Sequence, residues 1–208
     1  MATAPKISRS NAAAVYCVLG ATGTGKTSWV MDQIVKNKPR RLLIWDTKGE
    51  FAAEGYAMPV PDLFTMTHEI RRIGKAGHFR LAYRPRGDDK QLRAQFDFFC
   101  TVAWHTKRLT VVAEELADVT QPGFACAGWR RITSQGRTEG LTIYGLSQRP
   151  ASIDKHFFSN ASLVRSSRLN FAGDIKVVSN VLRMPVDNLT GFEWISRDMQ
   201  TGAITQGK

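Results

Sequence analysis

The sequence lacks the features of exported, disulfide-stapled and membrane-spanning chains. Among its 208 residues are 3 cysteines, Cys17, Cys100 and Cys126, an odd number without the CxxC spacing of zinc and redox sites. Each cysteine lies in an apolar stretch, so we expect buried, reduced thiols in a cytosolic protein. The first residues hold no apolar segment of the signal-peptide kind, and no run approaches the ~18 apolar residues of a membrane helix. We therefore expect a protein that is neither exported by a signal peptide nor anchored by its own helix.

Acidic residues are scarce relative to basic ones. The chain has 29 lysines and arginines against 18 aspartates and glutamates, which gives a formal net charge of +11. Such a surplus favours a polyanionic partner, either nucleic acid or anionic lipid, although solvated lysines produce the same count. Hydrophobic residues make up 43% and charged residues 23%, a composition typical of a soluble globular protein. The length fits one ordinary domain.

Internal repeats, low-complexity tracts and long linkers are absent as well. We predict a flexible basic arm over residues 1–11 and a single domain over residues 12–208, with an irregular insertion at about 52–87. Apolar strand-like runs alternate with helical stretches through the rest of the chain. This alternation is the pattern of an α/β fold with a mainly parallel sheet flanked by helices.

Periodicity and capping residues place the main elements along the chain. We predict strands at residues 13–19, 41–45, 109–113, 141–146 and 163–166. The predicted helices cover residues 26–35, 88–104, about 123–137, and a late stretch with Ile175, Val178 and Leu182 on one face. Residues 192–195 and the end of the chain predict a C-terminal hairpin.

A phosphate-binding motif follows the first predicted strand. The motif GxxxxGK[ST] is matched in full by Gly20, Ala21, Thr22, Gly23, Thr24, Gly25, Lys26 and Thr27. Its glycines let the backbone curl so that successive N–H groups face phosphate oxygens, and the following helix adds its positive dipole end. Lys26 would neutralise the β- and γ-phosphates, and the Thr27 hydroxyl would bind Mg²⁺. The sequence therefore predicts a P-loop site for ATP with Mg²⁺.

Two adjacent acids end the third predicted strand. Because Glu114 and Glu115 directly follow the buried run 109–113, they should reach the carboxyl edge of the sheet, where open α/β sheets bind their ligands. We expect Glu114 to face the magnesium, directly or through water, and Glu115 to act as the general base toward the attacking water. The alternative is that both acids simply begin a solvated loop.

Several further segments resemble the HerA–FtsK superfamily of DNA-pumping ATPases. The stretch from Val111 to Asp118 is similar to the family's apolar strand with paired acids, and Asp46 to Glu50 to its Asp-x-Lys-Gly-Glu segment. The stretch from Gly136 to Pro150 is similar to the family's basic segment, strand and Gln-Arg-Pro signature. Together the matches span roughly residues 13–185. The resemblance implies a RecA-like P-loop NTPase core of the additional-strand (ASCE) class, and the family normally has Asp where this chain has Glu114.

Roles at the matching positions follow from the resemblance. Gln148 would sense the γ-phosphate as a neutral hydrogen-bond donor, or it only caps the end of its strand. Arg137 would be the arginine finger that reaches the neighbouring subunit's nucleotide, which requires a ring of five or six subunits. Three nearby arginines are alternative fingers, DNA contacts or plain surface: Arg130, Arg131 and Arg149.

Among the family's branches, the chain looks most like the small genome-packaging ATPases of membrane-containing icosahedral viruses. This resemblance implies a double-stranded DNA translocase in the host cytoplasm or on the virion, docked on a capsid vertex or a viral membrane protein. One alternative is a filament-assembly ATPase of the Zot type, and another is a non-motor P-loop enzyme. The guanine signature Asn-Lys-x-Asp of GTPases is absent, and paired glutamates suit water activation better than phosphate transfer to a small molecule.

Two basic clusters have a functional and a structural interpretation each. The first follows the P-loop helix and either contacts DNA or complements the helix dipole: Lys36, Lys38, Arg40 and Arg41. The second surrounds Tyr83 and is either a nucleic-acid patch or the outward side of an edge strand: His78, Arg80, Arg84 and Arg86.

Overall fold

In the computed structural model, which describes residues 13–208, the strands form one nine-stranded sheet with the order β3-β4-β2-β5-β6-β1-β7-β8-β9. Its strands are β1 (Val15–Leu19), β2 (Arg41–Trp45), β3 (Met58–Val60), β4 (Phe79–Tyr83), β5 (Thr110–Ala113), β6 (Thr142–Ser147), β7 (Leu163–Ser167), β8 (Trp194–Asp198) and β9 (Ile204–Gly207). The pairs from β3 to β7 are parallel, while β8 and β9 add an antiparallel hairpin. The predicted α/β class and the C-terminal hairpin are both confirmed, and the arm predicted for residues 1–11 lies outside the described residues.

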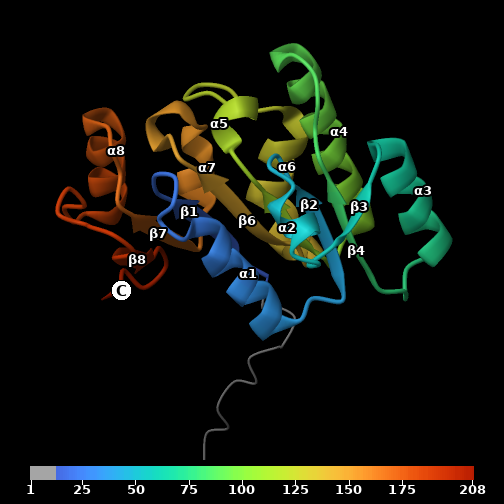
Figure 1. The fold of residues 1–208 in the computed structure, drawn as a ribbon, viewed down its shortest axis with the longest axis horizontal. Helices are drawn as coiled ribbons and strands as arrows, with labels where there is room; N and C mark the ends of the chain where they lie inside the picture. The colour runs from blue at the N-terminus through green and yellow to red at the C-terminus, as the bar shows by residue number, and fades with distance from the viewer. Residues whose placement is uncertain (1–12) are drawn as a thin grey trace, which may run out of the picture.

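Helices cover the two faces of the sheet unequally. The helical elements are α1 (Lys26–Asn37), α2 (Glu50–Ala53), α3 (Leu63–Ile73), α4 (Asp89–Thr106), α5 (Leu116–Val119), α6 (Ala127–Gln135), η2 (Gly136–Glu139), η3 (Pro150–Ser152), α7 (Lys155–Asn160) and α8 (Ala172–Leu182). A large apolar cluster joins one face to α3, α4, α5, α6, α7 and α8, and a smaller cluster joins the other face to α1 and α2. Figure 1 shows α1 crossing this second face, with α3 and α8 at opposite ends of the molecule.

The alternation of side chains along the central strands produces these two clusters. In β1, Val15, Cys17 and Leu19 belong to the large cluster, whereas Val18 packs under α1 with the smaller one. The central strands are buried on both faces because they lie inside a parallel sheet. All three cysteines are buried and free, as predicted.

Residues 52–87 correct the sequence analysis. We expected the least regular part of the chain there, but the segment forms β3, α3 and β4 and extends the sheet beyond β2. Arg80 faces outward on β4, as the strand interpretation of this basic cluster required, yet β4 lies between β3 and β2 and is not an edge strand. The short β3 contains a proline and is itself the edge, where a missing N–H is tolerated.

The helix at α4 illustrates a boundary that local chemistry sets. Asp88 caps it by accepting a hydrogen bond from the Gln91 backbone, while the Gln91 side chain accepts from the Asp88 backbone in return. Against α4 packs α6, whose Gly128 allows the close approach, since a Cβ there would lie 2.7 Å from the Asp97 carbonyl oxygen. Gly128 therefore has a packing function inside this helix. No helix among residues 13–208 has the length and apolarity needed to cross a bilayer.

Candidate active site

The P-loop is attached to the carboxyl ends of the strands on both sides of β1. The Gly20 backbone N–H donates to the Ser147 carbonyl at the end of β6 over 3.3 Å, and the Ala21 N–H donates to the Arg168 carbonyl just beyond β7 over 2.8 Å. Gly20 has φ +149°, and a Cβ at this position would lie 2.6 Å from the Thr24 hydroxyl. Only glycine fits this position, so the motif's first residue is required by the geometry of the loop.

The N-terminus of α1 is left open toward the loop. Its N-cap, Gly25, has a left-handed backbone and supplies no side-chain cap. The first backbone N–H groups of a helix have no partner within the helix, and here no capping side chain takes their place. Together with the positive end of the helix dipole they form a site for anionic oxygen atoms.

Lys26 folds over the same loop. Its Nζ donates to the carbonyl oxygens of Gly20 at 2.6 Å and Ala21 at 2.8 Å. Burial lowers the pKa of Lys26 to about 8, against the opposing attraction of Glu115 and Glu114. A phosphate bound in the loop would offer this amino group a fully charged partner in place of carbonyl dipoles.

Glu114 lies directly beside the start of α1. The Thr27 hydroxyl donates to its Oε1 over 3.3 Å, and the Thr47 hydroxyl donates to its Oε2 over 3.4 Å. Burial, followed by the negative charges of Asp46 and Glu50, raises the pKa of the Glu114 carboxyl to about 7. The acid predicted to face the metal is therefore in contact with the hydroxyl predicted to bind it.

The oxygen atoms at this position fit a magnesium ion. Mg²⁺ is commonly held by one or two protein groups, substrate phosphates and several waters, and Thr27 and Glu114 supply the protein share. Nearby Asp46 is fully buried, and its Oδ1 has no hydrogen-bond partner within residues 13–208. This oxygen could accept a hydrogen bond from an ordered water or from the hydration shell of a cation. No cluster of three or more metal-binding side chains exists in the described part of the chain, so the phosphates would have to complete such a site.

Glu115 turns away from Glu114 toward β6. Its backbone is left-handed, with φ 45°, a conformation that a non-glycine residue adopts at a cost and that is common at functional sites. Its Oε1 accepts hydrogen bonds from the Ser147 hydroxyl at 3.2 Å and the Gln148 backbone N–H at 3.1 Å. Burial raises the pKa of its carboxyl above the ordinary value. The strained turn thus separates the two acids, one toward Thr27 and the other toward Gln148.

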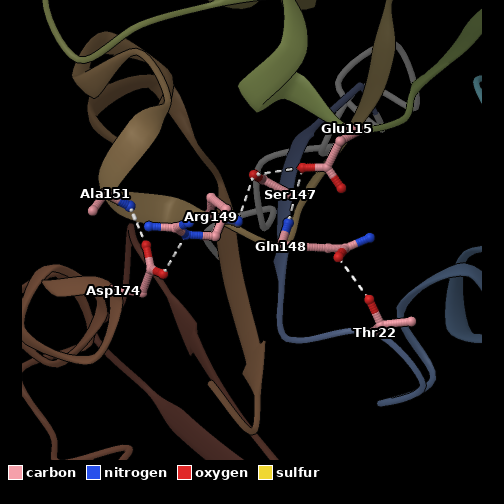
Figure 2. A network of polar contacts seen from close by, with 7 residues as sticks. All are labelled: Thr22, Glu115, Ser147, Gln148, Arg149, Ala151 and Asp174. Carbon is pink, nitrogen blue, oxygen red and sulfur yellow. Dashed lines mark hydrogen bonds and ion pairs between the residues drawn. The ribbon is translucent and has the colours of Figure 1, made fainter. Parts of the chain in front are cut away.

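Gln148 bridges Glu115 and the P-loop. Its backbone N–H points at Glu115, and its side chain extends toward Thr22, whose hydroxyl donates to Oε1 over 2.7 Å (Figure 2). Because the amide oxygen is engaged as an acceptor, the NH₂ group is the part of the side chain available as a donor. The predicted sensor position is therefore placed between the predicted base and the predicted phosphate loop.

The arginines named from the sequence lie in different surroundings. Arg149 donates through Nε to the buried Asp174 of α8 over 2.9 Å (Figure 2). Its guanidinium also lies over the ring of Phe171, the N-cap of α8, and is therefore engaged within its own subunit. Arg131 lies over the Trp104 ring, 5.4 Å from its centroid. Arg137 is exposed on η2, just before β6 begins. It therefore lies at the amino ends of the parallel strands, whereas the P-loop lies at their carboxyl ends. The six residues of β6 separate the amino ends of the strands from the carboxyl ends by ~17 Å.

Sequence reasoning missed several partners in this site. Ser147 orients Glu115, Thr47 contacts Glu114, and Asp174 holds both Arg149 and the Ala151 backbone. Thr22 was predicted as a P-loop residue, but its contact with Gln148 was not. Ser147 and Thr47 each lie at or just after the end of a predicted strand, which was a usable signal. Asp174 lies in a helix far along the chain, and its sequence position alone gives no sign of the contact.

Comparisons with known proteins found similarity in sequence and in fold. No protein-family model matches the chain. It is 29% identical over 178 residues to Protein P9 of Pseudoalteromonas phage PM2, which covers 84% of this chain and 74% of P9.

Solved structures share its fold. The genome packaging NTPase B204 from Sulfolobus turreted icosahedral virus 2, in complex with AMPPCP, superimposes with a TM-score of 0.72 at 10% identity, covering 94% of this chain and 97% of B204. VirB4 of Thermoanaerobacter pseudethanolicus gives a TM-score of 0.70 at 10% identity, over 98% of this chain and 91% of VirB4. These likenesses confirm the fold that the motifs predicted: the chain has the P-loop NTPase fold.

Proposed function

We propose that this chain is a magnesium-dependent ATPase that translocates double-stranded DNA during the packaging of a viral genome. One observation carries the enzymatic part of the proposal. Side chains from the ends of three strands converge on a single P-loop: Glu114 and Glu115 after β5, Gln148 after β6, and Lys26 after β1. This combination supplies positive charge, a metal-side acid, a base and a neutral donor, which are the parts that phosphoryl transfer to water requires.

Each side chain has a separate task in the proposed reaction. The open N-terminus of α1 and Lys26 bind the β- and γ-phosphates of ATP. Glu115 accepts a proton from the attacking water, and the Gln148 NH₂ group donates to a γ-phosphate oxygen as charge develops there. Thr27 and Glu114 would hold Mg²⁺, which would supply neutralisation of the phosphate charge. The products are ADP and inorganic phosphate.

The motor part of the proposal draws on the relatives and on the charge. B204 is described as a genome packaging NTPase, and the similar Protein P9 also comes from a virus. The net charge of +11 suits a protein that handles DNA, since lysines and arginines release condensed counterions when they meet phosphates. A capsid vertex or a viral membrane protein is the docking partner that genome packaging requires.

The position of Arg137 supports a ring. Because Arg137 lies at the amino ends of the strands, opposite its own P-loop, it can assist catalysis only in a neighbouring subunit. The same edge is basic around an open cleft of about 410 Å³, with Arg40, Arg41, Lys75 and Arg108 among its lining. Such an edge is complementary to a neighbour's acidic site with its bound triphosphate, in a head-to-tail contact that closes into five or six subunits.

The proposal is tested by ATP hydrolysis in the presence and absence of double-stranded DNA. We expect magnesium-dependent phosphate release that linear duplex DNA stimulates several-fold, with weaker stimulation as salt rises. The Lys26→Ala variant should be inactive under both conditions. ATP hydrolysis that DNA does not stimulate would support the enzymatic assignment but contradict the motor function. Wild-type protein without any ATPase activity would contradict both.

A further inference from the structure

The catalytic groups determine the direction in which a bound nucleotide must extend. Glu115 and Gln148 come from β5 and β6, which lie on one side of β1 in the sheet order. A nucleotide whose last phosphate faces these groups must carry its ribose and base away from them. With Glu115 and Gln148 in their proposed roles, the base would extend from the P-loop toward β7 and β8, on the opposite side of β1.

On that side an exposed aromatic ring lies against the P-loop. Phe192, just before β8, keeps 64% of its surface exposed. Its Cδ1 and Cε1 lie 3.5 and 4.0 Å from where a Cβ on Gly25 would lie, so the ring borders the N-cap of α1. Single exposed aromatic side chains are common on protein surfaces, so the feature that distinguishes Phe192 is its position beside the phosphate-binding N-cap of α1.

Two local structures hold this ring in place. A tight turn presents it: the Glu193 N–H donates to the Thr190 carbonyl over 2.9 Å, and the Glu193 carboxylate accepts from the Thr190 N–H and hydroxyl over 2.9 and 2.8 Å. Gly191, with φ 51°, precedes Phe192 in this turn. The ring is thus presented by a closed four-residue turn with a fixed backbone path.

A stack of three side chains then joins β8 to the P-loop helix. The Arg165 guanidinium lies between two indoles, 3.8 Å from the ring centroid of Trp194 and 5.0 Å from that of Trp29. Trp29 is one helical turn beyond Gly25, to whose carbonyl its N–H donates over 2.9 Å. The segment carrying Phe192 is therefore fixed relative to the phosphate-binding end of α1.

We infer that Phe192 is the stacking platform for the nucleobase of the bound nucleotide. The inference rests on the proposed nucleotide site and adds a base subsite to it. Stacking on a phenyl ring covers the exposed face and excludes water from it, but every base has such a face. The platform therefore selects a nucleoside over a bare triphosphate and distinguishes adenine from guanine only weakly.

The test compares the affinities of ATP, GTP and inorganic tripolyphosphate by calorimetry. In the Phe192→Ala variant, ATP and GTP should each bind about 5- to 150-fold more weakly, the range expected for one lost base–aromatic stack. Tripolyphosphate should bind as in the wild type, and Phe192→Tyr should restore ATP affinity. Phe64→Ala is the matched control, because Phe64 is 80% exposed on α3 at the other end of the sheet and should change nothing.

Two results would overturn the inference. Unchanged ATP affinity in Phe192→Ala would show that the base does not use the ring, and equal losses for ATP and tripolyphosphate would show that the ring only buttresses the P-loop. Failure of the proposed function looks different, because wild-type protein would then bind neither tripolyphosphate nor ATP in a way that Lys26→Ala abolishes.

Discussion

The hydroxyl of Thr22 donates a 2.7 Å hydrogen bond to the side-chain oxygen of Gln148, 126 residues further along the chain. This bond joins a variable position of the P-loop to the end of β6 and orients the glutamine amide. Since the oxygen is occupied, the NH₂ group is the end left to meet a phosphate. The proposed sensor role of Gln148 therefore depends on its NH₂ group, which can be removed by substitution.

Replacing Gln148 with glutamate keeps the size of the side chain but removes its donor. We expect Gln148→Glu to slow single-turnover hydrolysis about 100-fold or more, the scale of one lost transition-state donor. The negative charge of the glutamate would also repel the γ-phosphate. Thr22→Val should have a smaller effect, because it removes only the positioning bond. Equal rates for Gln148→Glu and the wild type would assign Gln148 a purely structural task.

Lys26 tests the phosphate site itself. Lys26→Ala should abolish ATP hydrolysis and weaken the binding of a non-hydrolysable ATP analogue, because the main cation facing the β- and γ-phosphates is lost. The fold should survive, since among residues 13–208 the Lys26 amino group bonds only to the carbonyl oxygens of Gly20 and Ala21, and the loop keeps its backbone bonds to Ser147 and Arg168. Thermal unfolding followed by circular dichroism supplies that control, and wild-type turnover in the variant would end the P-loop assignment.

The two glutamates should separate kinetically, as their different partners in the structure indicate. Glu115→Gln should still bind ATP with magnesium but hydrolyse it at least ~100-fold more slowly, the scale of a lost general base. Glu114→Gln should in addition raise the magnesium concentration needed for half-maximal activity, because Glu114 is the acid in contact with Thr27. Magnesium titrations of both variants decide the matter, and exchanged phenotypes would exchange the two roles.

Arg137 is tested by mixing inactive variants. Arg137→Ala retains an intact catalytic site, while Glu115→Gln retains an intact finger, so a mixed ring contains complete interfaces and should regain part of the activity. A trans arginine contributes ~10³ to 10⁵ in rate, so the recovery should be large against the background of either variant alone. A double variant carrying both substitutions, mixed with Glu115→Gln, is the negative control.

Co-assembly without recovered activity would exclude Arg137 as the finger. Arg130 and Arg131 would then be the next candidates, since both are exposed on α6. Arg149 is the weaker alternative because Asp174 and Phe171 already engage its guanidinium.

Local chemistry made much of the core predictable. The bounds of β2 follow from one short apolar run, the start of α4 from the Asp88 capping box, and the P-loop from its glycines. The two acids after β5 were placed at the correct edge because parallel strands carry their ends to the same side. These are features in which neighbouring residues determine the structure.

The features that escaped prediction depend on contacts between distant segments. The edge strand β3 is three residues long and includes a proline, so its pattern is too short to identify without β4 beside it. The Asp174 contact with Arg149 and the position of Phe192 against Gly25 arise only when α8 and the segment before β8 pack beside the P-loop. The hydrophobic periodicity of those segments does not predict contacts with a distant part of the chain.

Displacement of a triplex-forming strand from linear duplex DNA tests the central claim most directly. A motor that moves along the duplex must strip the third strand from it, so we predict displacement that requires ATP and magnesium and fails in Glu115→Gln. The rate should fall steeply with rising salt, because the grip on DNA depends on phosphate contacts. Rapid ATP hydrolysis on the same DNA, by assembled rings that leave the third strand in place, would contradict the account.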